Sequence, residues 1–540
     1  MLPRFCCNVH WSKNPDGGSR GSRPDLNRSH PLIQPISAAL TRTAATLLAL
    51  AAVSRLTAEE TFAGFGRAIQ EFRLGNGVRF AVLERHTSPA IAVHVRIRAG
   101  VTDEGPDQRH AATMLSRLFI HGSATLGSRD PAQEKAFMEA AERHGDEIAK
   151  EAARGDKANP LLSQDADIKA RIARDEALRY GHTFFFRDAF AAQAVAGLTA
   201  QAGPDAFQLA GAASSTRAEF LFKAFGEWVR KPALRAYYLE RRVHEDLLDR
   251  EKPNPIRLMQ ASLLTAAFDG LPYAKLQPGI EILRLLRPAQ VEEFIARRFV
   301  GGNVAVAVVG DITAAEAKRL AGLYFGKTAA GGADPEAPAG AREAVSEKRI
   351  EVPFTGAEAL TLAWYRPPGT HEDAVLFEVL DSLLSAGPSS LLHQALLGAD
   401  RLARHVRVSS SYPGDRRPNL FAIECSPAPG HTAGELEKAV DRVLDRLRNA
   451  PPAAADTARA KSSLRRQYAA ALDTNQGAAA ALARFSLDFG SGAALVAAMD
   501  RIQKINPEDL QRVVRQWLKP GARFVVRAGT PGMYAPEDPQ

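Results

Sequence analysis

Cysteine is scarce in this chain, which contains only three in 540 residues. Cys6 and Cys7 are adjacent near the N-terminus, so a disulfide framework and a cysteine zinc site are both excluded. Cys425 ends a stretch of strand character that leads into a proline-containing loop, where a buried structural thiol is the ordinary interpretation. No run approaches the roughly 18–20 continuous apolar residues of a membrane-spanning helix. We therefore expect no stable membrane span.

Positive charge is also limited once its position is considered. The formal net charge is +8, but residues 1–57 hold seven Lys or Arg and two Asp, which accounts for +5 and leaves +3 for the rest. A surplus of that size does not indicate a nucleic-acid partner. No G-x-S-x-G elbow, P-loop or G-x-G-x-x-G motif follows a strand pattern, so these nucleophile and nucleotide sites are not expected.

The first 57 residues differ in character from the remainder. Residues 1–40 are rich in Pro, Ser and Arg without periodicity, and we interpret them as a disordered leader or a mis-annotated start. In residues 41–57 an arginine precedes a short apolar run, which is the order of a secretory signal peptide. We therefore expect export to the periplasm or the cell exterior. The alternative is a surface-docked helix, because Arg55 occupies the place of a small-residue cleavage site.

An internal repeat organises the rest of the chain. Residues 287–311 and 506–530 superimpose without a gap, so that a proline opens both copies and Gly310 falls on Gly529. Each copy has the pattern of a helix with Pro in its first turn, a Gly-containing turn and a buried strand. Two copies at corresponding ends of two segments imply a duplicated domain.

We therefore predict an α+β fold of two duplicated domains, each a mostly antiparallel sheet packed with helices. The boundaries are 63–327 for the first domain, 345–530 for the second and 328–344 for a linker rich in Gly, Ala and Pro. A highly charged helical insertion is expected at about 130–182, and a solvated arm is its ordinary interpretation.

Local patterns refine this prediction. Residues 72–100 contain alternating strands around the tight turn Asn76-Gly77, and residues 107–121 have the pattern of an amphipathic helix. In the last strand, Arg523 and Arg527 recur at strand spacing, which predicts the solvent face of an antiparallel sheet.

Several segments together resemble the insulinase-like (pitrilysin) zinc metallopeptidases. The family's opening is matched by Leu74-Gly75-Asn76-Gly77, Arg98-Ala99-Gly100 and HAATMLSRLFIHGS at 110–123. Later segments that match are 240–255, 303–312 and 385–396, so the resemblance covers nearly all of 63–530. It implies the duplicated fold and a half-length chain that pairs face to face with a related chain around a hollow chamber.

The resemblance also shows where the family's chemistry should lie. Active members carry the inverted zinc motif H-x-x-E-H on the first helix, whose spacing places two imidazoles and a carboxylate on one face. Anchored on the shared end of that helix, the three positions hold Thr113, Ser116 and Arg117. A guanidinium stays protonated and has no lone pair for a metal, and serine has no carboxylate to act as general base. The resemblance therefore implies a degenerate zinc site.

The position of the third zinc ligand is ambiguous. Counting forward from Glu240 reaches Leu247, whereas counting back from Asn254-Pro255 reaches Asp246. Asp246 or Glu245 would keep a carboxylate there, but a single carboxylate does not hold zinc. A solvated helix face is the alternative interpretation.

Histidines elsewhere do not restore the site. His110 and His121 share a helix face but would lie roughly 16 Å apart along it, too far to share one ion. A relocated site that includes His244 is the remaining alternative. Active members also use an Arg and a Tyr from the second domain, and the matching positions here are Leu391 and Arg404. Both depart from the family pattern.

These observations lead us to predict a catalytically inactive homologue that serves as the non-catalytic subunit of an exported heterodimer enclosing peptides. Its expected partner is a related chain with an intact H-x-x-E-H motif, and no cofactor is expected. Two alternatives remain: an active zinc metalloendopeptidase with misaligned ligands, which would bind zinc, and a stand-alone peptide-binding scaffold.

Overall fold

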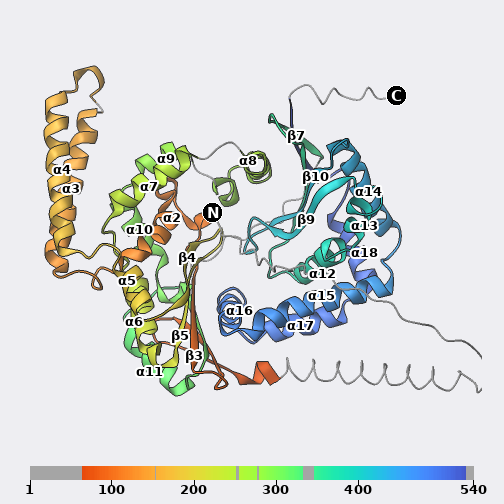
Figure 1. Ribbon diagram of the computed structural model, residues 1–540, viewed down its shortest axis with the longest axis horizontal. Coiled ribbons are helices and arrows are strands. Elements are labelled where there is room, and N and C mark those ends of the chain that lie inside the picture. The colour runs from red at the N-terminus through yellow and green to blue at the C-terminus, as the bar shows by residue number, and fades with distance from the viewer. Residues whose placement is uncertain (1–63, 153, 251–253, 277–278, 333–345, 531–540) are drawn as a thin grey trace, which may run out of the picture. The chain divides into compact units, whose positions relative to one another are not determined.

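The computed structural model describes residues 64–152, 154–250, 254–276, 279–332 and 346–530 (Figure 1). The predicted leader at 1–40 and signal peptide at 41–57 lie outside the described residues, as do residues 333–344 of the predicted linker. All described residues belong to one compact unit, Thr61–Gln540.

The first sheet has six strands in the order β1-β2-β6-β3-β5-β4. Their bounds are β1 (Ile69–Arg73), β2 (Arg79–Glu84), β3 (Ala90–Ile97), β4 (Ala196–Ala202), β5 (Phe207–Ser214) and β6 (Val304–Gly310). Neighbouring strands are antiparallel except for β2 and β6, which are parallel. The predicted turn between β1 and β2 is present, and Gly77 has the positive φ of 101° that such a turn requires.

The second sheet has five strands in the order β7-β11-β8-β10-β9. Their bounds are β7 (Lys348–Pro353), β8 (Ala359–Arg366), β9 (Ala403–Tyr412), β10 (Asn419–Pro427) and β11 (Phe524–Gly529). Here β7 and β11 form the parallel pair and the other pairs are antiparallel. With β1 set aside, the two sheets have the same strand order, and the strands of the sequence repeat, β6 and β11, hold the same place.

Helices pack on both sheets, which confirms the predicted α+β fold class. The first half contains α2 (Ala111–Leu118), α3 (Pro131–Ala152), α4 (Pro160–Tyr180), α5 (Phe185–Ala192), α6 (Ala218–Arg230), α7 (Tyr237–Asp249), α8 (Pro255–Phe268), α9 (Ile280–Leu285), α10 (Pro288–Arg298) and α11 (Ala314–Phe325). The second half contains α12 (Ala374–Ser385), α13 (Leu391–Leu397), α14 (Ala433–Asn449), α15 (Ala454–Asp473), α16 (Asn475–Asp488), α17 (Ala494–Lys504) and α18 (Pro507–Trp517).

One helix of each half packs on the sheet of the other half. Helix α16 packs on β3 and β6 of the first sheet, and α8 packs on β7, β8 and β11 of the second. Small residues on the first sheet, including Ala81, Ala92 and Ala307, belong to the same core cluster as α16 and let it approach closely. The hydrophobic core therefore runs continuously between the two halves.

Equivalent hydrogen bonds hold the two exchanged helices. Arg98 Nη2 donates to the carbonyl of Leu487 in α16 at 2.6 Å, and Tyr365 Oη donates to the carbonyl of Ala267 in α8. Arg98 and Tyr365 occupy equivalent places in the two halves. Aligned positions of the sequence repeat in β6 and β11 pair with residues of β3 and β8, and Arg98 and Tyr365 each lie two residues after that paired residue. The duplication thus extends to individual contacts.

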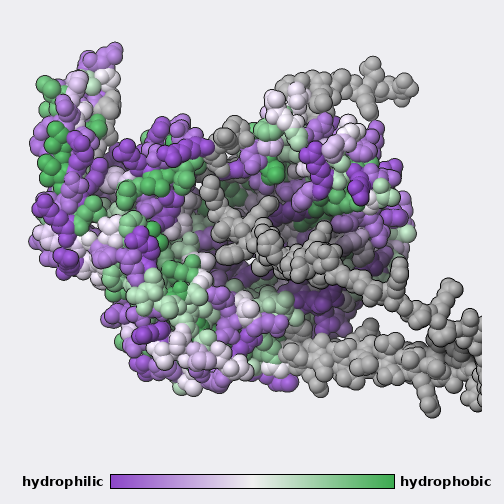
Figure 2. Space-filling view, in the orientation of Figure 1, coloured by the Kyte–Doolittle hydropathy of each residue, from purple (hydrophilic) through white to green (hydrophobic). Residues whose placement is uncertain are grey.

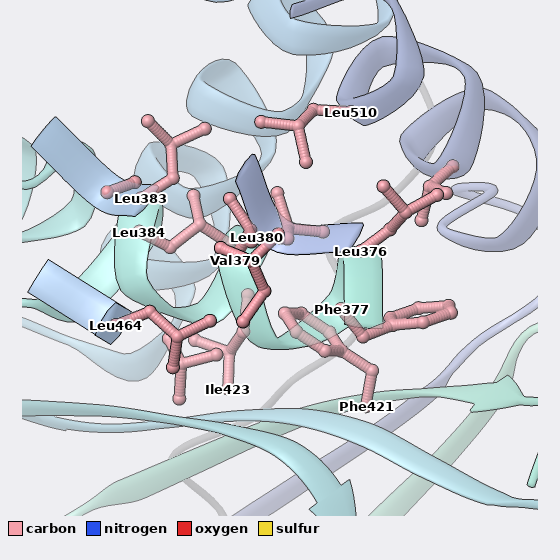
Figure 3. Close-up of a cluster of buried hydrophobic side chains, with 14 of the residues drawn as sticks. Leu376, Phe377, Val379, Leu380, Leu383, Leu384, Phe421, Ile423, Leu464 and Leu510 are labelled. Carbon is pink, nitrogen blue, oxygen red and sulfur yellow. The ribbon is translucent and has the colours of Figure 1, made fainter. Parts of the chain in front are cut away.

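Helix α12 shows how the second half is stabilised (Figure 3). Its residues Phe377, Leu380 and Leu384 are fully buried, and they pack with residues from β10 such as Phe421 and Ile423. Burying an aliphatic or aromatic side chain of this size contributes about 1.5–3 kcal/mol. The buried Cys425 on β10 belongs to the same cluster, as its sequence context predicted.

Two local predictions were wrong. The first helix begins at Ala111 and not at residue 107, because His110 adopts a left-handed conformation with φ 75° that ends the preceding short turn. Arg527 of β11 and Arg523, which directly precedes the strand, do not face solvent. Arg523 is 4% exposed, and both Arg523 and Arg527 pair with Glu437 of α14, which covers that face of the strand.

The charged segment at 130–182 forms a helical hairpin of α3 and α4, which pack against each other. A stripe of small residues on α4, Ala166, Ala170, Ala173 and Ala177, is buried in this contact. Hydrophobic surface is also visible on the hairpin (Figure 2). On α4, Leu161 is 72% exposed and Ile172 is 57% exposed. Across the described ranges, no helix has the combination of length and apolar character that a bilayer crossing requires.

Candidate functional site

The degenerate zinc motif lies on α2, which contacts α7. Thr113, Ser116 and Arg117 are on the partly exposed side of α2, whereas Met114 and Leu115 are buried in the core. The hydroxyl of Ser116 donates a hydrogen bond to the carbonyl of Thr113 at 2.7 Å. The Ser116 hydroxyl is thus hydrogen-bonded within its own helix.

Arg117, at a position that the sequence resemblance assigns to a zinc ligand, forms an ion pair. Its Nη2 lies 3.0 Å from Glu240 Oε2 on α7, and the other carboxylate oxygen, Oε1, lies 3.1 Å from His121 Nε2. The Glu240 side chain is 8% exposed and that of His121 is fully buried. Both oxygens of the carboxylate therefore have partners in a largely dry environment.

The electrostatics favour a charged Glu240. Burial alone would raise the pKa of this carboxyl, but the hydrogen bond from His121 and the charge of Arg117 outweigh it and hold the pKa below its ordinary value. Glu240 is thus an anion whose counter-charge is the guanidinium of Arg117.

A pair of histidines lies beside this ion pair. The rings of His110 and His244 are 5.4 Å apart and nearly perpendicular, and His110 Nε2 is 3.2 Å from the carbonyl of Gly279. Burial, with the nearby charges of His110 and Arg117, lowers the pKa of His244 to about 4. His244 is therefore neutral at physiological pH, and its buried Nε2 has no hydrogen-bond partner among the described residues.

These residues do not fit a zinc ion. Arg117 is a permanent cation, and it already neutralises the carboxylate of Glu240. The other buried carboxylate beside α2, that of Glu104, accepts from the backbone N–H groups of His110 and Ala112. The described residues include no group of three or more His, Cys, Asp or Glu arranged to hold a metal. The site therefore offers neither a metal-bound water nor a free carboxylate to activate one.

The remaining predicted positions are dispersed. Asp246 is on the exposed side of α7, and Glu245 pairs with Arg241 at 3.2 Å. Leu391 opens α13 and is partly buried against the second core, while Arg404 is exposed on the edge strand β9. The structure does not bring Asp246 to α2, because its helical position points away from the face that carries Glu240 and His244.

Glu240 is the site residue that sequence reasoning missed, since it served only as a starting point for counting. A signal was present: Glu240 and His244 are four residues apart, so they share a helix face. What the sequence does not show is that this face meets α2, because the α3–α4 hairpin separates the two helices along the chain.

Part of the chain is similar to a known protein family. Residues 286–464 match the family model described as the Peptidase M16 inactive domain. Over this segment the chain is similar to the M16, or insulinase-like, peptidases. This result confirms the family predicted from the sequence, and the matched model is of the inactive type.

Solved structures agree on the fold of this M16 homologue. A protease from Helicobacter pylori has a TM-score of 0.68 and 17% identity over 85% of this chain and 99% of its own. A peptidase M16 inactive domain from Pseudomonas fluorescens has a TM-score of 0.65 and 18% identity over 86% and 98%. A chain of Complex III2 from Candida albicans has a TM-score of 0.61 and 14% identity over 85% and 95%. No curated protein sequence matches the chain.

Proposed function

We propose that this M16 homologue is the non-catalytic subunit of an exported peptidase pair, which encloses peptides together with a related chain that carries an intact H-x-x-E-H motif. The observation that supports the proposal is the ion pair between Arg117 and Glu240, because the sequence resemblance assigns the position of Arg117 to a metal ligand. Without a metal and a general base, the site on α2 would have no means to activate water for peptide hydrolysis.

The intact fold supports a role in an assembly. Two sheets, their helices and the contacts of the exchanged helices are complete, because burial of their apolar faces and not a metal supplies their stability. The match to an inactive M16 domain is in keeping with retention of shape without chemistry. The similarity to a chain of Complex III2 adds that this fold occurs in a multi-subunit assembly.

Co-expression with a related chain that has an intact zinc motif tests the pairing. We expect the two chains to co-purify in equal amounts, the pair to hydrolyse a peptide library, and this chain alone to be inactive. In a pair whose partner carries a Glu-to-Gln change in its own H-x-x-E-H motif, activity should vanish. Peptidase activity that survives this change would contradict the proposal.

Two further measurements separate the alternatives. Stoichiometric zinc in the purified chain, removed by a chelator together with peptidase activity, would support the active enzyme. A monomer that binds peptides and ignores every related catalytic chain would support the stand-alone scaffold. Export is tested by N-terminal sequencing of the mature protein, which should start beyond residue 57, and a peptide from residues 1–30 would contradict it.

A further inference from the structure

The duplication gives the degenerate zinc motif a counterpart in the second half. Helices α2 and α12 are both followed by a glycine with positive φ, Gly122 at 97° and Gly387 at 85°. Aligning these two glycines places Glu378 on Thr113, Asp381 on Ser116 and Ser382 on Arg117. The second half therefore keeps two carboxylates at the spacing of a zinc-motif ligand and its general base.

Helix α15 is the counterpart of α7. The helices that follow them, α8 and α16, have Asn254 and Thr474 as their N-caps, and matching these two residues aligns α7 with α15. The same offset matches Ala267 with Leu487, whose carbonyls accept the equivalent hydrogen bonds described above. It also places Ala460 on Glu240. Ser382 Oγ donates to the carbonyl of Ala460 at 3.0 Å, just as Arg117 contacts Glu240 in the first half.

In the second half this place is a cavity of about 750 Å³. It lies between α12, α15, α16 and the edge strand β9, and its charged or hydroxyl-bearing lining residues are Arg366, Glu378, Asp381, Ser382, Ser385, Ser410, Ser411, Asp415, Tyr468 and Arg484. A cavity of this size accommodates a small ligand or a few residues of a peptide, and its polar walls favour a hydrophilic one.

The two cations of the cavity are held by protein groups. Arg484 forms an ion pair with Asp415. Arg366 is 3% exposed and donates to the carbonyls of Pro367 and Ser410, while its guanidinium lies 4.9 Å from the ring centre of Phe377. Both guanidinium groups are thus fixed in place as part of the wall.

The carboxylates on α12 have neutral hydrogen-bond donors. Tyr468 Oη donates to Glu378 Oε2 at 2.7 Å, and Asp381 accepts from Ser385 Oγ at 2.8 Å and from the backbone N–H of Ser410 at 3.2 Å. Burial, with the nearby charge of Glu378, raises the pKa of Asp381 to about 6. A negative charge on Asp381 is therefore costly, and a bound cation would offset that cost.

Asp381 and Arg366 also close the sheet edge at this point. The backbone N–H of Ser410 donates to Asp381, and its carbonyl accepts from Arg366. Both outward backbone groups of this edge residue therefore have partners. A ligand in the cavity would therefore meet side chains rather than add a strand at Ser410.

From this geometry we infer that the cavity binds an alkylammonium group, as carried by a lysine side chain of a peptide, through Glu378 and Asp381. The serine hydroxyls of α12 and β9 supply further acceptors for its N–H groups. The inference rests on the proposed function only in its choice of a peptide as the source of the ammonium group.

Isothermal titration of the isolated full chain tests this assignment without any catalytic partner, so it can fail or succeed independently of the pairing. The probes are three: the blocked peptide acetyl-Ala-Ala-Lys-Ala-Ala-amide, its norleucine analogue, which lacks the ammonium group, and free spermidine. We expect the lysine peptide to bind at least tenfold more tightly than the norleucine peptide. Equal affinity of the two peptides would overturn the inference. Binding of spermidine without binding of the lysine peptide would support an ammonium site and overturn only the choice of a peptide as its source.

Variants connect the binding to the cavity. Glu378→Gln and Asp381→Asn preserve shape, and each should weaken the lysine peptide about tenfold or more. Ala471→Lys, at an exposed position that lines the cavity, should abolish binding by placing an ammonium group of the protein there. The control Asp400→Asn removes an equal charge from an exposed site in the same half and should change nothing. Unchanged binding in all three cavity variants would place the ligand elsewhere and refute the assignment.

Discussion

The ion pair between Arg117 and Glu240 predicts a specific loss of stability. Removing the cation with Arg117→Met leaves a carboxylate that is 8% exposed without its counter-charge. Breaking a fully buried pair costs about 3–5 kcal/mol. The Arg117 side chain is 22% exposed and His121 remains as a donor, so we expect a smaller cost of about 2 kcal/mol in the free energy of unfolding.

Guanidinium unfolding measures this loss through tryptophan fluorescence. Trp228 is a suitable reporter, since it is fully buried and its ring lies 5.4 Å from that of Phe119, directly after α2. The control is Arg171→Met, which breaks a pair with Asp167 whose side chains are 63% and 53% exposed. We expect this control to cost less than about 0.5 kcal/mol.

A double variant distinguishes the ion pair from a simple loss of packing. Combining Arg117→Met with Glu240→Gln removes both charges together and keeps an acceptor for His121, so at least half of the stability lost in Arg117→Met should return. The reasoning is refuted if Arg117→Met costs no more than Arg171→Met, or if the double variant is no more stable than Arg117→Met alone.

Three more outcomes follow from the structure. Because the pKa of His244 is about 4 in the folded chain and near 6.5 when unfolded, stability is lost as pH falls from 6.5 to 4. His244→Gln should reduce the loss between pH 7 and 4.5, measured by guanidinium midpoints, by about 1 kcal/mol, less than the full linkage value because the ring is partly exposed. Asp381 has a folded pKa of about 6, raised from 3.8, so the stability from its neutral form is lost as pH rises through 6. Asp381→Asn should therefore be more stable than the parent by about 1–2 kcal/mol at pH 7 and equal to it at pH 3.5 in the same assay. Gly310 has φ 137°, and a methyl group there would lie 2.1 Å from the carbonyl oxygen of Ala90. Gly310→Ala should therefore lower the melting temperature strongly. The control Gly322→Ala in α11 has open space around it and should leave the melting temperature unchanged or raise it.

The fold was largely accessible from the sequence because its signals are local. Alternation in residues 72–100 indicated strands, and the repeat of Gly310 and Gly529 indicated equivalent places in two sheets. The exchange of α8 and α16 was not accessible. An apolar helix face shows that a surface will be buried, but it does not show which of two similar sheets will cover it.

The site was accessible only in part for the same physical reason. Arg117 could be recognised as incompatible with a metal from its chemistry alone. Its partner Glu240 lies 123 positions later in the chain, beyond the α3–α4 hairpin, so tertiary packing of α2 on α7 decides the contact. The left-handed conformation of His110, which shortens α2, likewise has no local sequence signal of the kind that a glycine gives.

Because α8 and α16 each pack on the sheet of the other half, the two halves cannot be separated without exposing both sheets. If the chain were cut between its halves, each fragment would have one sheet face without the helix that covers it. Each fragment would also carry a helix whose apolar face has no sheet to pack on. Neither fragment would be a self-sufficient folding unit, so the covalent connection mainly ensures that two mutually dependent pieces meet at a favourable effective concentration.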